Sequence, residues 1–280
     1  MKRTFSRPIK RVVVKLGSSQ IVDGKLKPRG AQLSSLVKQI KQLHKRGIEV
    51  VLVSSGAISL GMGELGEKKR PTDLADLQAR AAIGQAALMR LYSEVFRKVE
   101  LKCAQVLLTW DDFDNRTRFS NARHTLEAII KKGVVPIINE NDTTSTEEIK
   151  FGDNDKLSAL VASCLHADLL VLLSDVDGIY DENKNYMIGE YNEVTPEILT
   201  VSQGTANVQI ARGGMKAKTE AVKIATHAGT PCVITAGSRK NVLVDLIAAE
   251  RIGTYFIEKN HKLLDGDSQH EFVRLHLKNR

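Results

Sequence analysis

The feature that most constrains the fold of this chain is an alternation of short apolar runs with longer amphipathic segments. The short runs are dominated by apolar, often β-branched residues, which is typical of strands buried on both faces of a parallel sheet. They span residues 12–16, 49–53, 104–108, 134–138, 169–173 and 231–234. The segments between them carry apolar residues at helical spacing. This alternation predicts an α/β fold, a three-layer α/β/α sandwich with a central, mainly parallel sheet.

Length and composition bound the class of protein. The chain has 280 residues, of which 42% are hydrophobic, enough for one large α/β domain or two small ones. No apolar run approaches the ~18 residues of a membrane span, and the charged N-terminus is not followed by the apolar segment of a secretory signal. Cys103, Cys164 and Cys232 are odd in number and far apart. They indicate reduced core thiols of a cytoplasmic protein, not a disulfide or a zinc site.

The net charge of +8 is concentrated at the N-terminus, a basic tail over residues 1–9 that runs into the first strand. Lys2, Arg3, Arg7, Lys10 and Arg11 supply five of these charges. A short basic tail is more often a solvated terminus than a nucleic-acid-binding arm, so nucleic-acid binding is disfavoured.

In open α/β sheets, ligands bind outside the carboxyl ends of the strands, so the loops that follow the strands are the candidate sites. In the first loop, Lys15 ends an apolar run and is followed by Gly17, Ser18 and Ser19. A lysine in such a run is costly unless its ammonium meets an anion or water. The loop is either a phosphate cradle or the end of an edge strand whose lysine reaches solvent.

The second loop begins with Ser55 and Gly56, directly after a predicted strand, where hydroxyl and backbone N–H groups can hold a carboxylate or a phosphate. Further on, Gly61, Gly63 and Gly66 match the G-x-G-x-x-G dinucleotide-binding fingerprint letter for letter. We reject this match because the fingerprint requires its glycines to follow the strand at once and to open a helix. No Walker A pattern occurs, which excludes a P-loop enzyme.

The third loop follows the run 134–138 and is unusually rich in acids and amides. A helix N-cap explains one of the residues at the start of the next apolar stripe, but not all of them. Acids and amides together suit a small zwitterionic ligand, although they could equally order lysines or bind a divalent cation. The residues concerned are Asn139, Asn141, Asp142, Asp153, Asn154 and Asp155.

The fourth loop begins with Ser174 and Asp175, which follow the fifth predicted strand. They could cap a helix or bind the ribose hydroxyls of a nucleotide.

The fifth loop is predicted to place Gly213 and Gly214 before a helix whose first turn carries Lys216 and Lys218. Cations at a helix N-terminus oppose the helix dipole. An anion held by the glycine N–H groups and a lysine would account for them.

Together these loops pair an anion-binding half with an acid-and-amide half, which suits phosphoryl transfer to a small polar molecule. Their motifs resemble those of the glutamate 5-kinases of the amino acid kinase family, in order and spacing over residues 10–257. The motifs are VVVKLGSS, VLVSSGAI, LLTWDDFDNRTRFSNARHTL, PIINENDT, KFGDNDKLSALVA, LLSDVDGIY, GGMKAK and a closing GTYFI.

The resemblance implies a carbamate kinase-like fold and transfer of the γ-phosphate of ATP to the side-chain carboxylate of L-glutamate, with Mg²⁺ carried by ATP. This is the first step of proline biosynthesis. The resemblance divides the chain into the basic tail 1–9, a kinase domain over residues 10–258 and an extension over 259–280 without a PUA-type domain. It also implies a homo-oligomer, feedback inhibition by proline and transfer of the product to a glutamyl phosphate reductase.

The resemblance also assigns residues. Lys15 and Lys218 flank the transferred phosphoryl group, and Asp155 orients both lysines. Glutamate is held by Ser55, Gly56, Asn139, Asp142 and Asn154. ATP is held by Lys15, Gly17, Ser174, Asp175, Gly213, Gly214, Met215 and Lys218. No general base is needed, since a glutamate carboxyl with a pKa of about 4.3 is already ionised at neutral pH.

The chain departs from the family pattern at Arg212 and Lys216, where threonine is common, and at Ser174, which also replaces threonine. Two alternatives remain. A sister kinase for aspartate, acetylglutamate, carbamate or a nucleoside monophosphate would share the fold, although K-L-G-S-S does not match the K-F-G-G-T-S opening of aspartate kinases. A catalytically inactive regulator would be expected to have lost Lys15, Asp155 or Lys218, and all three are present.

Overall fold

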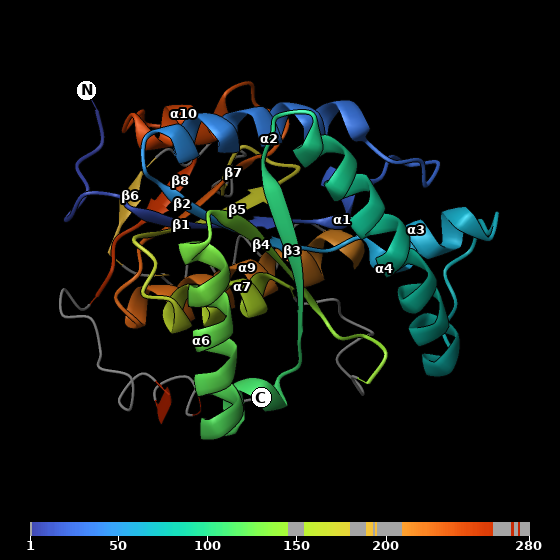
Figure 1. The fold of residues 1–280 in the computed structure, drawn as a ribbon. Coiled ribbons are helices and arrows are strands. Elements are labelled where there is room, and N and C mark those ends of the chain that lie inside the picture. Colours follow the sequence, from blue (N-terminus) through green and yellow to red (C-terminus); the bar gives the residue numbers. More distant parts are fainter. Residues whose placement is uncertain are drawn as a thin grey trace.

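In the computed structural model of the chain, the described residues are 2–144, 154–179, 189–192, 194, 209–259, 270, 271 and 274; for 209–213 only the backbone is described. Strands and helices form three layers, with one sheet between two layers of helices (Figure 1). No helix in this part of the chain is long and apolar enough to cross a membrane.

All six predicted strands are present and lie in one sheet with the order β3-β4-β2-β1-β5-β7-β8-β6. Every neighbouring pair is parallel except β7 and β8, which confirms the mainly parallel sheet. The strands are β1 (Arg11–Leu16), β2 (Glu49–Ser54), β3 (Lys102–Leu108), β4 (Val134–Glu140), β5 (Leu169–Ser174), β6 (Glu190–Tyr191), β7 (Cys232–Ala236) and β8 (Thr254–Phe256).

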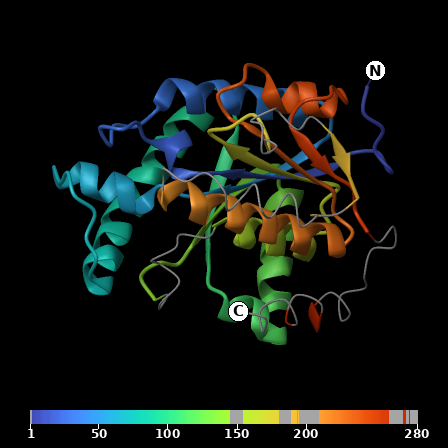
Figure 2. The ribbon, with the colours of Figure 1, turned by 180° about the vertical axis from the view of Figure 1, so that it is seen from behind.

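The helices cover both faces of the sheet: α2, α4 and α10 lie on one face, and α6, α7 and α9 lie on the other (Figures 1 and 2). Their bounds are α1 (Ser18–Ile21), α2 (Gly30–Lys45), α3 (Ala57–Glu64), α4 (Leu74–Arg97), α5 (Asp111–Asp114), α6 (Arg116–Lys131), α7 (Asn154–Cys164), α9 (Gln209–His227) and α10 (Val242–Ile247).

The core has two halves because successive side chains of a strand point to opposite faces of the sheet. Val12 and Val14 of β1 pack into the half that includes α2 and α4, whereas Val13 packs into the half that includes α7 and α9. Strands buried on both faces are therefore apolar throughout, as the sequence indicates.

Strand β3 departs from this prediction, because only its last residue, Leu108, is buried. Lys102, Gln105 and Leu107 are exposed. The reason is its position: β3 is an edge strand with β4 as its only neighbour in the sheet. An edge strand has a neighbouring strand on one side only, so its side chains are less buried. The residues of β3 gave no indication of this position.

The basic N-terminal tail is not solvated as expected. Arg3 is 4% exposed, and its guanidinium lies 4.6 Å from the centre of the Tyr255 ring in β8. The backbone N–H of Arg3 donates to the Ala249 carbonyl (2.6 Å), and Arg7 pairs with Asp168 (2.8 Å). Cation–π contact and ion pairing hold this segment against the domain, so its charge is largely used within the protein.

The glycines that mimic a dinucleotide fingerprint have a different role. Gly61 and Gly63 lie inside α3, as the rejection of that motif requires. A Cβ at Gly61 would lie well inside 3.0 Å of the Arg80 carbonyl oxygen, and one at Gly84 would come equally close to the Ala57 carbonyl oxygen. These two glycines therefore allow α3 and α4 to cross in close contact, which brings α4 up to the ends of β2 and β4.

Candidate active site

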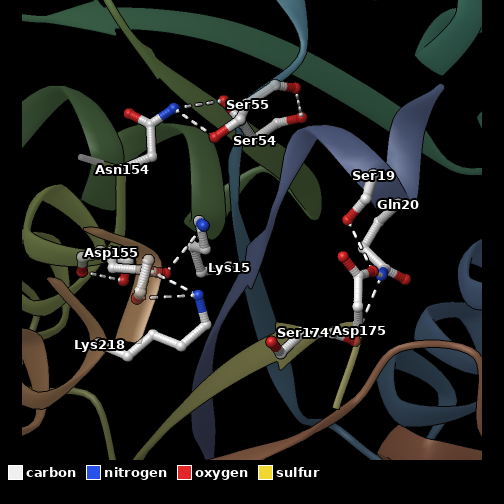
Figure 3. A network of polar contacts seen from close by, with 12 residues as sticks. Lys15, Ser19, Gln20, Ser54, Ser55, Asn154, Asp155, Ser174, Asp175 and Lys218 are labelled. Atoms are coloured by element: carbon white, nitrogen blue, oxygen red, sulfur yellow. Dashed lines mark hydrogen bonds and ion pairs between the residues drawn. The ribbon is translucent and has the colours of Figure 1, made fainter. Parts of the chain in front are cut away.

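The carboxyl ends of β1, β2, β4 and β5 meet at one edge of the sheet because these strands are parallel neighbours. Lys15 lies near the end of β1, Ser55 follows β2, and Asn139 is the second-to-last residue of β4. Helix α7 begins beside them with Asn154 and Asp155 (Figure 3). Residues of the first three loops of the sequence analysis therefore lie at one edge of the sheet.

At the centre of this edge, one carboxylate pairs with two ammonium groups. Asp155 Oδ1 lies 2.8 Å from Lys15 Nζ, and Asp155 Oδ2 lies 3.1 Å from Lys218 Nζ (Figure 3). Asp155 is 3% exposed and Lys15 is 5% exposed. Lys15 therefore meets the carboxylate of Asp155 in the interior and does not reach solvent, and β1 is a central strand, so the edge-strand interpretation of the first loop is wrong.

Electrostatics keep Asp155 ionised. Burial favours the neutral carboxyl, but the charges of Lys15 and Lys218 outweigh this effect and hold the pKa of Asp155 below its ordinary value. Two cations and one anion leave an excess positive charge at this point. A buried site with such an excess is suited to binding a further anion.

The glycines beside Lys218 are not where the sequence analysis expected them. Helix α9 begins at Gln209, so Gly213 and Gly214 lie inside it, and neither Lys216 nor Lys218 is in its first turn. Glycine in a helix interior costs only about 1 kcal/mol relative to alanine, so the helix can continue through both residues. The predicted glycine cradle at a helix N-terminus is therefore wrong, although Lys218 still reaches the centre.

A network of amides joins the ends of β2 and β4 to α7. Asn154 Nδ2 donates to Asn139 Oδ1 (2.8 Å), to Ser55 Oγ (2.9 Å) and to the Ser54 carbonyl (3.1 Å). The side chain of Asn154 is thus directed to β2 and β4 and is not occupied in capping its own helix. Asp153, the other candidate cap, lies outside the described residues.

A cavity of about 80 Å³ opens next to this network. All five residues predicted to bind the substrate line it: Ser55, Gly56, Asn139, Asp142 and Asn154. Its other lining residues are Ser18, Ala57, Ile58, Ser59, Arg70 and Glu140. Gly56 has a φ of 107°, which favours glycine. The first turn of α3, which follows it, lines the cavity, and the first N–H groups of a helix have no partner within the helix and can donate to an anion.

The cavity contains opposed charges. Burial, assisted by the nearby Glu140 charge, raises the pKa of Asp142 to about 7, although Arg70 acts in the opposite direction. Burial also lowers the pKa of Arg70. Within the described part of the chain, the Arg70 guanidinium forms no hydrogen bond or ion pair. Sequence reasoning missed Arg70 because it sits in a run of charged residues, EKKRP, that looks like an ordinary solvated loop.

The predicted nucleotide side lies across β1 and β5. Asp175 Oδ1 accepts from Ser19 Oγ (2.7 Å) and from Gln20 Nε2 (2.9 Å), which links the loop after β5 to α1 (Figure 3). Ser174 ends β5, and Gly17 lies between β1 and α1. Met215 packs against the core half under α9. Among the described residues, no group of three or more His, Cys, Asp or Glu side chains could hold a metal ion.

Comparison with known proteins agrees with these observations. The profile of the amino acid kinase family matches residues 10–236. A glutamate 5-kinase of Carboxydothermus hydrogenoformans is 44% identical over 266 residues, covering 93% of this chain and 71% of that protein. One of Clostridium acetobutylicum is 43% identical over 257 residues, covering 90% of this chain and 96% of that protein.

The fold also resembles a solved structure. Carbamate kinase from Giardia lamblia bound to AMP-PNP superposes with a TM-score of 0.62 at 18% identity, covering 89% of this chain and 98% of that chain. At this identity the likeness concerns the fold alone, and it confirms the predicted carbamate kinase-like architecture.

Proposed function

The chain belongs to the amino acid kinase family, and on that premise we propose that it is a glutamate 5-kinase. It transfers the γ-phosphate of ATP to the side-chain carboxylate of L-glutamate, which forms L-glutamyl 5-phosphate in the first step of proline biosynthesis. The choice of glutamate is supported by the glutamate 5-kinases that are 43–44% identical over at least 90% of the chain.

The observation that carries this proposal is the buried centre of Lys15, Asp155 and Lys218 next to a polar cavity. The acceptor carboxylate is ionised at neutral pH, so it needs no general base. The obstacle is the approach of one anion to another, and the excess positive charge of this centre offsets it. Catalysis then consists of positioning and charge stabilisation, as expected for phosphoryl transfer.

In the proposed reaction, a side-chain carboxylate oxygen of glutamate forms a bond to the γ-phosphorus. The bond from that phosphorus to the oxygen that bridges the β- and γ-phosphates breaks, and ADP leaves. Lys15 and Lys218 contact the transferred group from β1 and α9, and Asp155 holds both ammonium groups in place. Cations fixed in advance in this way need no reorganisation during the reaction.

For the substrate, we assign the two ends of the amino acid to different groups of the cavity. Asp142, with Glu140 beside it, receives the ammonium group. Ser55 and Gly56 hold the carboxylate that is phosphorylated, and Asn139 and Asn154 support Ser55 beside it through their hydrogen bonds. Arg70 is the only cation among the described residues that line the cavity, so it is the candidate partner of the second carboxylate.

For ATP, the proposed contacts are Lys15, Lys218, Gly17, Ser174 and Asp175. Gly213, Gly214 and Met215 remain predicted on the resemblance alone, because the helix start on which their physical argument depended is absent. Mg²⁺ is proposed to enter with ATP, since this ion is commonly held by nucleotide phosphates and water. It would neutralise phosphate charge, and no residue of the chain is assigned as its ligand.

The wider assignments of the family remain proposals. They comprise a kinase domain over residues 10–258, a homo-oligomer, a cytoplasmic location, inhibition by proline and consumption of the acyl phosphate by a glutamyl phosphate reductase. The described strands run from Arg11 to Phe256, which agrees with these domain bounds.

The test is a trapping assay with purified protein, Mg-ATP and hydroxylamine, in which an acyl phosphate is converted to a coloured hydroxamate. Glutamate, aspartate, acetylglutamate and carbamate are offered separately. We expect colour with glutamate alone. Colour with another acid would replace the substrate, and ATP binding without any product would favour the inactive regulator.

A further inference from the structure

Gln85 of α4 lies behind the substrate cavity and does not line it. Its Oε1 accepts a hydrogen bond from Asn139 Nδ2 at 2.9 Å. The adjacent Gly84 lets α4 approach α3 closely, so the backbone places Gln85 within reach of β4. Gln85 belongs to none of the motifs that indicate the function.

The orientation of Asn139 is set by the backbone. The N–H of Glu140 donates to Asn139 Oδ1 at 2.9 Å. A backbone N–H can only donate, so the oxygen of this amide must face it and the nitrogen must face Gln85. Gln85 is therefore held with its own oxygen toward Asn139.

The same logic applies to Asn154. Its Nδ2 donates to the backbone carbonyl of Ser54, which can only accept, and also to Asn139 Oδ1. With the nitrogen on this side, Asn154 also donates to Ser55 Oγ at 2.9 Å. The amides of Gln85, Asn139 and Asn154 thus form a relay in which Asn154 is the donor on both sides, toward Asn139 and Gln85 and toward Ser55.

The end of this relay is Ser55, which lines the cavity. Because Ser55 Oγ accepts from Asn154, its hydroxyl hydrogen is available to a group inside the cavity. If Asn154 were turned over, its oxygen would take that hydrogen, and Ser55 could not donate to a substrate.

A purely structural reason for Gln85 is weak. Its Nε2 is buried and has no hydrogen-bond partner among the described residues, and the same holds for Asn154 Oδ1. A buried donor without a partner is costly. An apolar side chain of similar shape would avoid that cost but would leave Asn139 Nδ2 without its acceptor, so the glutamine serves Asn139 and not its own packing.

We propose that Gln85 is a positioning residue for the amino-acid substrate: it holds the side chain of Asn139 in place beside Asn154, so that Ser55 stays positioned to donate its hydroxyl to a carboxylate oxygen of the bound substrate. This rests on the proposed function. Gln85 itself touches neither substrate nor ATP.

The test compares Gln85→Met, Gln85→Glu and Gln39→Met with wild type in the hydroxamate assay, with glutamate binding followed separately by calorimetry. Methionine keeps the shape of Gln85 but removes the acceptor, whereas glutamate keeps an acceptor toward Asn139. Gln39 is the matched control because it is a buried glutamine of α2 whose Oε1 accepts from the Leu243 N–H (2.9 Å) and which does not line the cavity.

Gln85→Met is expected to raise the KM for glutamate about threefold to tenfold, the range of one lost hydrogen bond, and to leave the KM for ATP unchanged. Gln85→Glu is expected to regain most of this loss even if its buried carboxyl lowers the Tm further. Gln39→Met lowers the Tm without changing either KM. In a Ser55→Ala background, Gln85→Met is expected to lose most of its effect, because the relay no longer ends in a donor.

Three results would overturn the relay: a KM for glutamate within twofold of wild type in Gln85→Met, an equal rise in Gln85→Glu, or an undiminished effect of Gln85→Met in Ser55→Ala. Failure of the proposed function is distinct from all three. It would appear as wild-type protein that forms no glutamyl hydroxamate and binds no glutamate.

Discussion

Replacing Lys218 with alanine tests the proposed centre most directly. Lys218 and Lys15 share the carboxylate of Asp155, and the substitution removes one of the two cations. Asp155 keeps its pair with Lys15 at 2.8 Å, so the substitution leaves no uncompensated buried charge. We therefore expect the variant to fold, and the loss to fall on the chemical step.

The expected loss of folding stability and the expected loss of kcat differ in size. A charge-assisted hydrogen bond contributes about 1.5–3 kcal/mol, which bounds the loss of folding stability for Lys218→Ala. A cation positioned for the transition state resembles an oxyanion-hole donor, whose removal lowers kcat about 10²–10³-fold. By contrast, Asp155→Asn leaves two ammonium groups without their anion, and breaking a buried pair in this way costs about 3–5 kcal/mol.

The assay is steady-state kinetics with glutamate and ATP varied in turn, together with thermal unfolding. Lys223→Met is the control, since Lys223 lies on the same helix and its ammonium forms no hydrogen bond or ion pair in the described part of the chain. We expect kcat of Lys218→Ala to fall at least a hundredfold while the KM for glutamate changes little. Equal kcat in Lys218→Ala and wild type would refute the role of Lys218, and a fall in kcat matched by Lys223→Met would make the effect unspecific.

Three further predictions concern the cavity and its support. Since folding raises the pKa of Asp142 to about 7, the folded protein binds more protons than the unfolded chain between about pH 4 and 7, so stability falls as pH rises through this window. Asp142→Asn should flatten that slope in chemical denaturation and abolish the improvement in glutamate KM expected on going from pH 6 to 8. Arg70→Met should raise the KM for glutamate about 10–100-fold and spare that for ATP, the range of a charge-assisted bond; an unchanged KM would remove Arg70 from the site. Gly84→Ala should destabilise the protein by about 1–3 kcal/mol in thermal unfolding, because its Cβ would meet the Ala57 carbonyl, whereas Gly24→Ala, with nothing within 4 Å, should be neutral.

Many residues of the site could be predicted from the sequence, because parallel strands bring their carboxyl ends to one edge of the sheet. Lys15, Ser55 and Asn139 lie at or directly after the end of a strand, Asn154 begins α7, and the structure places all four at one edge of the sheet. Polar residues at such positions are a local signal. Arg70 and Gln85 give no such signal, since one lies in a charged loop and the other in the middle of an amphipathic helix.

The errors have the same origin. The burial of a residue depends on its tertiary neighbours, which the residues of β3 and of the N-terminal tail do not indicate. The predictions that Leu107 is buried and that Arg3 is solvated were therefore both wrong. For α9, two consecutive glycines suggested a boundary, but the helix continues through them. A glycine in a helix interior costs only about 1 kcal/mol relative to alanine, and the remaining residues of a long helix can offset this cost.

The sequence by itself determined the alternation of strands and helices, the mainly parallel sheet and the loops that carry the chemistry. These follow from hydrophobic periodicity and from the ends of strands, which are encoded over a few neighbouring residues. Only the tertiary structure showed how closely Asp155 pairs with the two lysines that the resemblance assigned to it, that Arg70 lines the same cavity as Asp142, and that Gln85 of α4 reaches Asn139 of β4. Those contacts join residues far apart in the chain, and they form only when α4, α7 and α9 pack against the same edge of the sheet.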